Sequence, residues 1–175
     1  MQELQFQQIL ERVDKIPGWF YQNQMEFLFP YAQKATNVFE IGTYAGRSTL
    51  FWTLCNPDAN IITTDTCIGV PSNGIPGVEI LPEVVNAGKI IALKEDSHEL
   101  VKRYNQPIDL FFLDGSHKYA DVCRDITDWL PKVNGIFVCH DYMDVWAEIK
   151  QACDNCLRGK FELIDDKHDM FVVKK

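Results

Sequence analysis

The chain has no long hydrophobic run. No segment reaches the roughly eighteen consecutive apolar residues that a membrane-spanning helix needs, so we expect no membrane partner. Residues 1–6 also lack the basic start and the apolar stretch of a secretory signal. The sequence therefore predicts a soluble, cytoplasmic protein.

Basic residues are scarce and scattered. The chain has 17 Lys and Arg against 25 Asp and Glu, which gives a formal net charge of −8, and no run of basic residues interrupts the acidic background. A surface that follows a nucleic-acid backbone needs clustered positive charge. We therefore expect a small-molecule substrate and no nucleic acid as partner.

The sequence also lacks a disulfide framework and a zinc-binding pattern. Its six cysteines lie mostly inside apolar segments, where a reduced thiol behaves as a small buried side chain. Cys153 and Cys156 form a single C-x-x-C, without a second cysteine pair or a downstream histidine pair at zinc spacing. This pair is best interpreted as part of a late helix.

Length and periodicity indicate one domain with an alternating helix and strand pattern. With 175 residues, of which 46% are hydrophobic, the chain is long enough for one full core and too short for two. We predict an N-terminal helical segment over residues 1–35, packed on a domain over residues 36–175. Its helices are an amphipathic one with Phe6, Ile9, Leu10 and Val13 on one face and a second one over residues 24–35.

The rest of the chain predicts an open α/β sheet. Strands are expected over residues 37–41, 60–65, 90–93, 108–114 and 136–139, and a final hairpin over residues 161–164 and 170–173. Helices are expected between them, over residues 46–55, 96–104, 119–130 and 144–157. These elements predict a three-layer sheet of seven strands, mostly parallel, with one antiparallel C-terminal strand. Residues 67–77, rich in Pro and Gly, are expected to form a loop near the site.

The most informative segment begins at the end of the first strand and reads Glu40-Ile41-Gly42-Thr43-Tyr44-Ala45-Gly46-Arg47-Ser48-Thr49. A buried strand here runs into a glycine turn and a helix start, the usual shape of a nucleotide-type cofactor site. Glu40 would repel a pyrophosphate and favour a cation, such as the ammonium of an amino-acid-bearing cofactor. Ser48 and Thr49 are expected to cap the helix.

Polar residues end the predicted parallel strands. The carboxyl ends of parallel strands share one edge of a sheet, where ligands bind. That edge should hold Glu40, Asp65, Asp114, His140 and Asp141. Crowded carboxylates raise one another's pKa unless a cation lies among them, so the pattern predicts a metal ion or a cationic ligand. Asp65 has the position of an acid that accepts hydrogen bonds from both ribose hydroxyls.

At these residues the sequence resembles the class I S-adenosylmethionine-dependent methyltransferases. The resemblance is narrower to the small family related to the catechol and caffeoyl-coenzyme A O-methyltransferases and to macrocin-type sugar O-methyltransferases. The segments that carry it are Glu40 to Ser48, Phe112-Leu113-Asp114-Gly115-Ser116-His117-Lys118-Tyr119, and Gly135 to Tyr142. The resemblance implies a Rossmann-like fold and S-adenosylmethionine as cofactor.

The family's cofactor contacts carry over to matching positions. The resemblance implies that Glu40, Gly42 and Gly46 hold the methionyl part, with Tyr44 and Ser48 in the same motif. It further implies that Asp65 holds the ribose, and that Asp96 and Ser97, with His98 beside them, lie at the adenine edge; Asp114 faces the methionine end.

In the metal-dependent branch of the family, Asp114 binds a divalent ion, and His140 and Asp141 match the acidic pair that completes the site. His140 replaces the usual Asp. Magnesium prefers oxygen ligands, whereas manganese, iron and zinc accept imidazole, so the resemblance leaves the ion open. His117 takes the position of the family's lysine base, and Lys118 follows it. The implied reaction is in-line attack of a substrate hydroxyl on the sulfonium methyl group, with Asp114 and His117 as catalytic residues.

Two other functions stay open at this stage. Asp114, His140 and Asp141 also resemble the two-carboxylate, one-histidine iron set of an oxidation enzyme, as in the cephalosporin hydroxylase-like group. Alternatively, the chain is a cofactor-binding protein that does not catalyse a reaction. The sequence does not identify the methyl acceptor: aromatic residues that fit either an apolar mouth or the core are Trp19, Phe20, Tyr21, Tyr142 and Trp146. The apolar segment up to Tyr31 fits packing on the sheet or across a homodimer interface.

Overall fold

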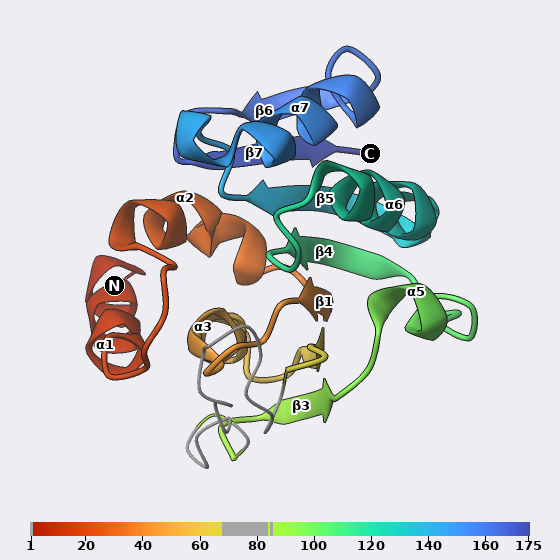
Figure 1. Ribbon diagram of the computed structural model, residues 1–175. Coiled ribbons are helices and arrows are strands. Elements are labelled where there is room, and N and C mark those ends of the chain that lie inside the picture. Colours follow the sequence, from red (N-terminus) through yellow and green to blue (C-terminus); the bar gives the residue numbers. More distant parts are fainter. Residues whose placement is uncertain (1, 68–83, 85) are drawn as a thin grey trace.

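The computed structural model describes residues 2–67, 84 and 86–175 (Figure 1). Residues 68–77 of the loop predicted over 67–77 lie outside the described residues. The described strands form one sheet of seven strands in the order β3-β2-β1-β4-β5-β7-β6. They are β1 (Asn37–Ile41), β2 (Asn60–Thr64), β3 (Lys89–Leu93), β4 (Ile108–Leu113), β5 (Val133–His140), β6 (Glu162–Asp165) and β7 (Met170–Lys174).

Helices connect and cover these strands. The α-helices are α1 (Gln2–Val13), α2 (Gln22–Ala32), α3 (Arg47–Cys55), α5 (Ser97–Leu100), α6 (Tyr119–Trp129) and α7 (Ala147–Cys156). Two short 3₁₀ helices, η1 (Leu130–Lys132) and η2 (Asp144–Trp146), precede β5 and α7. No helix in the described part of the chain is both long and apolar enough to cross a membrane.

The sheet confirms the predicted fold class. β1 pairs in parallel with β2 and β4, and the parallel arrangement continues to β3 on one side and β5 on the other. β7 runs antiparallel to both of its neighbours, β5 and β6, and is the one reversed strand. Phe171, Val172 and Val173 are buried on both faces of the sheet, which explains why the last strand of the chain lies inside the sheet rather than at its edge.

Each face of the sheet carries its own hydrophobic core. Leu110 and Phe112 of β4 point to the side of α1, α2 and α3, whereas Phe111 and Leu113 point to the side of α6 and α7. This alternation follows from the period of two along a strand. Figure 1 shows the result as three layers, with α1 to α3 on one side of the sheet and α5 to α7 on the other.

Several element boundaries differ from the sequence prediction. The helix predicted over residues 24–35 spans residues 22–32 as α2, and the helix predicted over residues 144–157 divides into η2 and α7. The helix predicted over residues 96–104 ends as α5 at Leu100, because the amides of Lys102 and Arg103 bond to carbonyls three residues back and tighten the chain into turns. β5 starts earlier than predicted, at Val133, which pairs with Ile108 of β4. Neighbouring strands, rather than local periodicity, set the length of β5.

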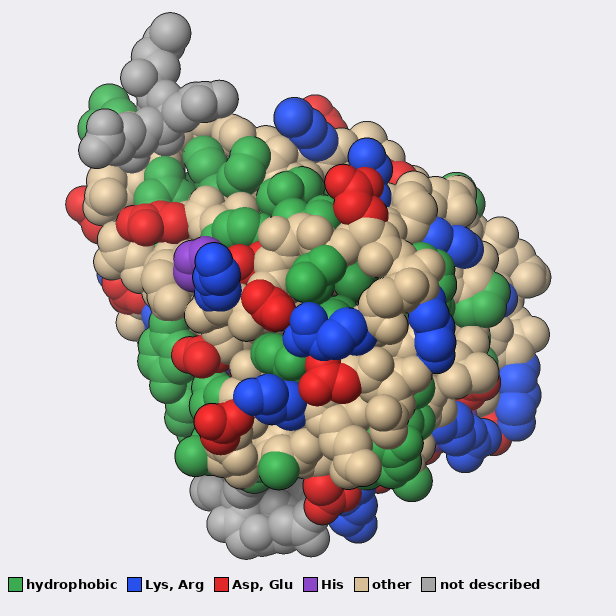
Figure 2. Space-filling view, turned by 90° about the horizontal axis from the view of Figure 1, so that it is seen from above, with side chains coloured by type: hydrophobic (Ala, Val, Ile, Leu, Met, Phe, Trp, Pro, Cys, Tyr) green, Lys and Arg blue, Asp and Glu red, His purple; other side chains and the backbone are tan. Residues whose placement is uncertain are grey.

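The outer surface over the C-terminal elements carries mixed charge. Figure 2 views the molecule from above Figure 1, on the side of α7, β6 and β7. Acidic and basic side chains alternate among the coloured residues of this face, without a continuous basic patch. This distribution agrees with the scattered Lys and Arg of the sequence.

The N-terminal segment is attached to the sheet domain by Arg47, at the start of α3. Its guanidinium donates to the carbonyls of Val13, Ile16 and Phe20, over distances of 2.8 to 3.2 Å. Its Nη2 also lies 2.6 Å from Oδ1 of Asp14. The side chain is only 15% exposed, so these bonds are largely shielded from water. Arg47 therefore adds a polar anchor to the apolar packing of Val13, Ile16 and Phe20.

We predict that Arg47→Met loosens the attachment of α1 to the domain. The change leaves three carbonyls without their donor, which costs about 3 kcal/mol at about 1 kcal/mol per hydrogen bond, and the exposed Asp14 adds little. Hydrogen exchange followed by mass spectrometry should show faster exchange in α1 and unchanged exchange in β4. Unchanged protection of α1 would contradict this role of Arg47.

Candidate functional site

The ends of the parallel strands are fixed beside one another by main-chain hydrogen bonds. The amide of Gly42 donates to Thr64, the amide of Asp114 to Ile41, and the amide of Asp65 to Leu93, over distances of 2.8 to 3.1 Å. These bonds continue the ladders just beyond the last strand residues. The structure thus brings the turns after β1, β2 and β4 together at one edge of the sheet.

The glycine turn after β1 lies directly on the turn after β4. Gly42 has φ +98°, and a Cβ atom placed on it would be 1.8 Å from the carbonyl oxygen of Asp114. Gly46, at the N-cap of α3, has φ +88°, and Tyr44 between them has φ +44°. The turn is therefore built from three left-handed residues, two of which are glycine.

Glu40 faces the inside of the turn. Its carboxylate is fully buried and accepts hydrogen bonds from the hydroxyls of Ser48 and Thr49 and from the indole of Trp52. Burial raises the pKa of Glu40 to about 7, against the opposing effect of these donors. A direct contact of Glu40 with a cationic ligand stays a prediction, because in this structure its oxygens are turned to α3.

The predicted capping role of Ser48 and Thr49 is wrong. Gly46 is the N-cap residue of α3, and no side chain caps this helix. The two hydroxyls donate to Glu40 instead, because a buried carboxylate requires donors and they are the nearest ones. Ser48 is 5% exposed, and its contact with the cofactor stays a prediction.

Asp65 is held beside the glycine turn. Its Oδ2 accepts from the amide of Tyr44 at 3.0 Å, and its Oδ1 accepts from the amide of Cys67 at 2.7 Å. Two backbone donors therefore fix the carboxylate in one orientation. A carboxylate oxygen has a second lone pair, so both oxygens can still accept from a ligand hydroxyl.

Asp96 and Ser97 lie farther along the same edge. Asp96 caps α5 by accepting from the amides of His98 and Glu99. The hydroxyl of Ser97 donates to the buried Asp125 at 2.6 Å, and His98 Nδ1 lies 3.3 Å from Asp128. These contacts fix the turn after β3, where the predicted adenine edge would be.

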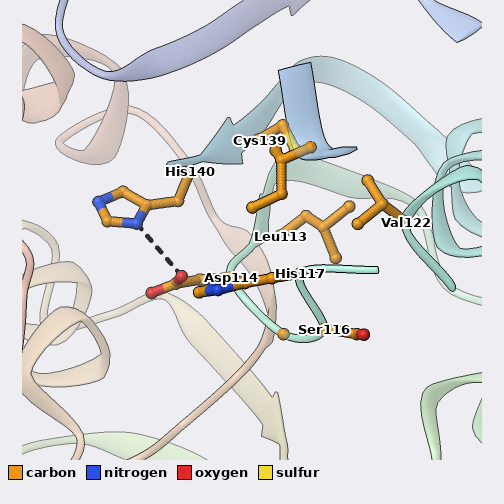
Figure 3. A pocket seen from close by; sticks show the side chains of 9 residues that line it. Leu113, Asp114, Ser116, His117, Val122, Cys139 and His140 are labelled. Atoms are coloured by element: carbon orange, nitrogen blue, oxygen red, sulfur yellow. Dashed lines mark hydrogen bonds and ion pairs between the residues drawn. The ribbon is translucent and has the colours of Figure 1, made fainter. Parts of the chain in front are cut away.

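Asp114, His140 and Asp141 converge on one point. Figure 3 shows the imidazole of His140 facing the carboxylate of Asp114. Nδ1 of His140 lies 3.2 Å from Oδ1 of Asp114 and 3.3 Å from Oδ1 of Asp141. His140 is buried, whereas both acids are partly exposed. Burial alone would lower the pKa of His140, but the two carboxylates raise it to about 10.

His117 extends this cluster on the open side. Its Nε2 lies 3.1 Å from Oδ2 of Asp141, and its ring packs on that of Trp146 at 4.2 Å between centroids. Burial disfavours the charged form of Asp141, but His117 and His140 outweigh it and hold the pKa of this carboxyl well below its ordinary range. Asp141 therefore bridges the two histidines.

His117 lines a small pocket with Leu113, Asp114, Gly115, Ser116, Val122, Cys139, His140 and Ile149.

The sequence analysis missed Gln24. This residue of α2 is 1% exposed, and its Oε1 lies 3.1 Å from Nε2 of His140. The sequence does contain a signal: an amide side chain lies beside the apolar Met25 and four positions before Leu28, on the buried face of α2. Such a residue needs a polar partner, although the sequence does not say which one.

The aromatic residues at the site divide into two groups. Phe20 and Tyr142 are buried and belong to the core, at 2% and 8% exposure. Trp19, Tyr21 and Trp146 are exposed by 41% or more. Trp19 packs on Tyr44 of the glycine turn, with ring centroids 5.2 Å apart. An exposed tryptophan thus lies beside the glycine turn, and another beside His117.

The donor set at Asp114, His140 and Asp141 fits a divalent ion. Each residue offers one ligand atom, and these atoms lie within 4.8 Å of one another. Two carboxylate oxygens and an imidazole nitrogen suit manganese, iron or zinc better than magnesium. The second nitrogen of His140 faces the amide oxygen of Gln24, as expected for a metal-ligating imidazole that donates its other N–H to an oxygen.

Comparison with known proteins agrees with this geometry. A family model described as a methyltransferase domain matches residues 39–142, which is more than half of the chain. The chain belongs to this family. The matched range begins in β1 and ends just after Asp141, so it includes the glycine turn and the cluster of Asp114, His140 and Asp141 but excludes Gln24. No curated protein matches the chain.

Solved methyltransferases share the fold. The O-methyltransferase NovP is 16% identical, with a TM-score of 0.69 over 87% of this chain and 79% of that one. An O-methyltransferase from Bacillus cereus in complex with SAH is 14% identical, with a TM-score of 0.65 over 98% and 90%. MycE, from mycinamycin biosynthesis and in complex with Mg and SAH, is 19% identical, with a TM-score of 0.60 over 97% and 48%. The predicted class I methyltransferase resemblance is confirmed.

We predict that Gly42→Ala destabilises the protein by more than about 3 kcal/mol. The left-handed φ alone costs a non-glycine residue about 1 to 2 kcal/mol, and the Cβ overlap with Asp114 adds to it. Gly159→Ala is the matched control: Gly159 has φ +74° with nothing within 4 Å of the added Cβ, so it should lose only about 1 kcal/mol. Urea denaturation measures both. Equal losses would disprove the close contact.

We predict that Glu40→Gln becomes more stable relative to the wild type as the pH rises. The folded pKa of Glu40 is about 7, above its unfolded value of about 4.3, so the unfolded chain ionises first. As the pH rises through these two pKa values, the wild type therefore loses stability. Gln does not ionise, so the variant has no such loss at this position. The difference in unfolding free energy between variant and wild type should change by about 3 kcal/mol from pH 4 to pH 8. Denaturation curves at both pH values test this, and a difference independent of pH would refute it.

Proposed function

We propose that the protein transfers a methyl group from S-adenosylmethionine to a hydroxyl of a small molecule, with a divalent ion held by Asp114, His140 and Asp141. The observation that carries the proposal is the convergence of three features at one sheet edge: the glycine turn, the Asp114–His140–Asp141 cluster and His117. SAH, the product that S-adenosylmethionine leaves after methyl transfer, is bound in the B. cereus and MycE structures.

The cofactor is proposed to lie over the glycine turn. The turn offers main-chain atoms without side chains at Gly42 and Gly46, which allows a close approach of the methionyl part. Asp65, fixed by the amides of Tyr44 and Cys67, accepts from the ribose hydroxyls. The backbone contact between Gly42 and Asp114 supports a position of the sulfonium end near the carboxylate of Asp114.

His117 is proposed to accept the proton of the substrate hydroxyl. Its Nε2 faces Oδ2 of Asp141, which favours the tautomer with hydrogen on Nε2 and a free lone pair on Nδ1. The substrate oxygen attacks the methyl carbon, the carbon–sulfur bond breaks with its electrons on sulfur, and the hydroxyl proton moves to Nδ1. Asp114, His140 and Asp141 would hold a divalent ion, which would lower the pKa of the substrate hydroxyl. Asp141 orients His117 throughout.

The acceptor is proposed to carry an apolar or aromatic ring. Trp146 packs on His117 and is 41% exposed, and Trp19 packs on Tyr44 and is 60% exposed. Exposed tryptophans beside the base and the glycine turn give a ring two flat surfaces on which to stack. These surfaces support alignment of the hydroxyl with the methyl group, on which the rate of displacement depends.

Oxidation is the second candidate, because His140 adds an imidazole to the two carboxylates. Two carboxylates and one histidine also suit iron in oxygen chemistry. Iron content after anaerobic purification, together with oxygen consumption in the presence of candidate substrates, separates the two functions. Methyl transfer requires S-adenosylmethionine and proceeds without oxygen.

We predict saturable one-site binding of S-adenosylmethionine in calorimetry. Gly42→Arg should abolish it, since the new side chain meets the Asp114 backbone, whereas Gly159→Arg, at a glycine with open space, should retain it. Added Mn²⁺ should bind to the wild type and much more weakly to Asp114→Asn, which removes one of the carboxylate ligands. Absence of cofactor binding in the wild type would refute the proposed function. Cofactor binding without any Mn²⁺ binding would restrict it to metal-independent transfer.

A further inference from the structure

Gln24 connects three distant parts of the chain. Its Oε1 accepts from the amide of Tyr21 at 2.9 Å and lies 3.1 Å from Nε2 of His140. Its Nε2 donates to the carbonyl of His168, in the link between β6 and β7, at 3.0 Å. With 1% exposure, the amide makes these contacts away from water.

These contacts fix the orientation of the amide. The carbonyl of His168 can only accept, so the nitrogen of Gln24 must face it. The amide of Tyr21 can only donate, so the oxygen of Gln24 must face that side. If the amide were flipped, its oxygen would face the carbonyl of His168 and its nitrogen would face the amide of Tyr21, so neither hydrogen bond could form. The atom presented to His140 is therefore the oxygen.

The oxygen of Gln24 determines which ring nitrogen of His140 carries hydrogen. Oε1 of Gln24 can only accept, so Nε2 of His140 carries hydrogen in every state that keeps this contact. The other ring nitrogen, Nδ1, then faces Asp114 and Asp141 at 3.2 and 3.3 Å. The rings of Phe20 and Phe112 pack beside the imidazole and restrict its rotation.

We propose that Gln24 is a positioning residue for the ion site: it holds His140 with hydrogen on Nε2, so that Nδ1 is the nitrogen that binds the divalent ion. This inference rests on the proposed function. It makes the N-terminal segment part of the site, since Gln24 lies outside the residues that match the family model. The ion site is then complete only when α2 is docked on the sheet.

The experiment compares Gln24→Met with Gln24→Glu. Met has a similar length but no acceptor, whereas Glu keeps an oxygen for Nε2 of His140 and for the Tyr21 amide. Gln22→Met is the matched control, because Gln22 lies on the same helix, is exposed, and bonds only to the exposed Glu26 in the described structure. Mn²⁺ affinity is measured on purified protein by electron paramagnetic resonance of the free ion, without any assay of activity.

We expect Gln24→Met to weaken Mn²⁺ binding about 10- to 100-fold, the usual effect of removing an outer partner of a metal ligand. Gln24→Glu should bind more tightly than Gln24→Met, and Gln22→Met should match the wild type. Wild-type affinity in Gln24→Met would overturn the inference while leaving the proposed function intact. Absence of Mn²⁺ binding in the wild type would overturn the ion site itself, and the inference with it.

A second measurement does not depend on the stability of the variants. Long-range proton–nitrogen NMR spectra of ¹⁵N-histidine-labelled wild-type protein, loaded with diamagnetic Zn²⁺, report which nitrogen of His140 is protonated and which is bound. His140→Gln, included for assignment, identifies its signals. We expect hydrogen on Nε2 and the ion on Nδ1. Zinc on Nε2 would refute the positioning role of Gln24.

Discussion

The contact between the main chains of Gly42 and Asp114 is the constraint on which the site depends. β1 and β4 are central neighbours in the sheet, and the amide of Asp114 donates to Ile41 at 2.8 Å. A side chain on Gly42 would overlap the Asp114 carbonyl, so the two turns touch through backbone alone. Hence the spacing between the glycine turn and the Asp114 carboxylate is set by two rigid strands. Methyl transfer, which requires an aligned nucleophile and methyl group, benefits from a spacing of this kind.

Charge at this edge is balanced by the chain itself. Asp114 and Asp141 meet the imidazole of His140, whose pKa they raise to about 10. His140 therefore carries a second proton at neutral pH when no ion is bound, and this proton compensates the two carboxylates. An Asp in its place would add a third negative charge and make the cluster dependent on an outside cation.

Much of the fold was predictable because its signals are local. The apolar run of Ile108–Leu113 is buried on both faces, and the hairpin of β6 and β7 follows from two apolar runs joined by a short polar link. The cluster of Asp114, His140 and Asp141 followed from the rule that parallel strands end at one edge. The roles of Ser48 and Gln24 depend instead on tertiary partners. The sequence around Ser48 is typical of a helix cap, and only the fold shows that its partner is the buried Glu40. Gln24 and His140 are in contact although 116 positions separate them in the sequence.

Arg47 and Gln24 make polar contacts that attach the N-terminal segment to the sheet domain. Arg47, the first residue of α3 after the glycine turn, binds the link between α1 and α2. Gln24, at the start of α2, binds His140 at the end of β5. Both contacts lie near the middle of the segment: one joins it to α3, and the other joins it to the cluster of Asp114, His140 and Asp141. Gln24 is buried and the Arg47 side chain is 15% exposed, and each makes several bonds, so undocking of the segment leaves unsatisfied polar groups at both places.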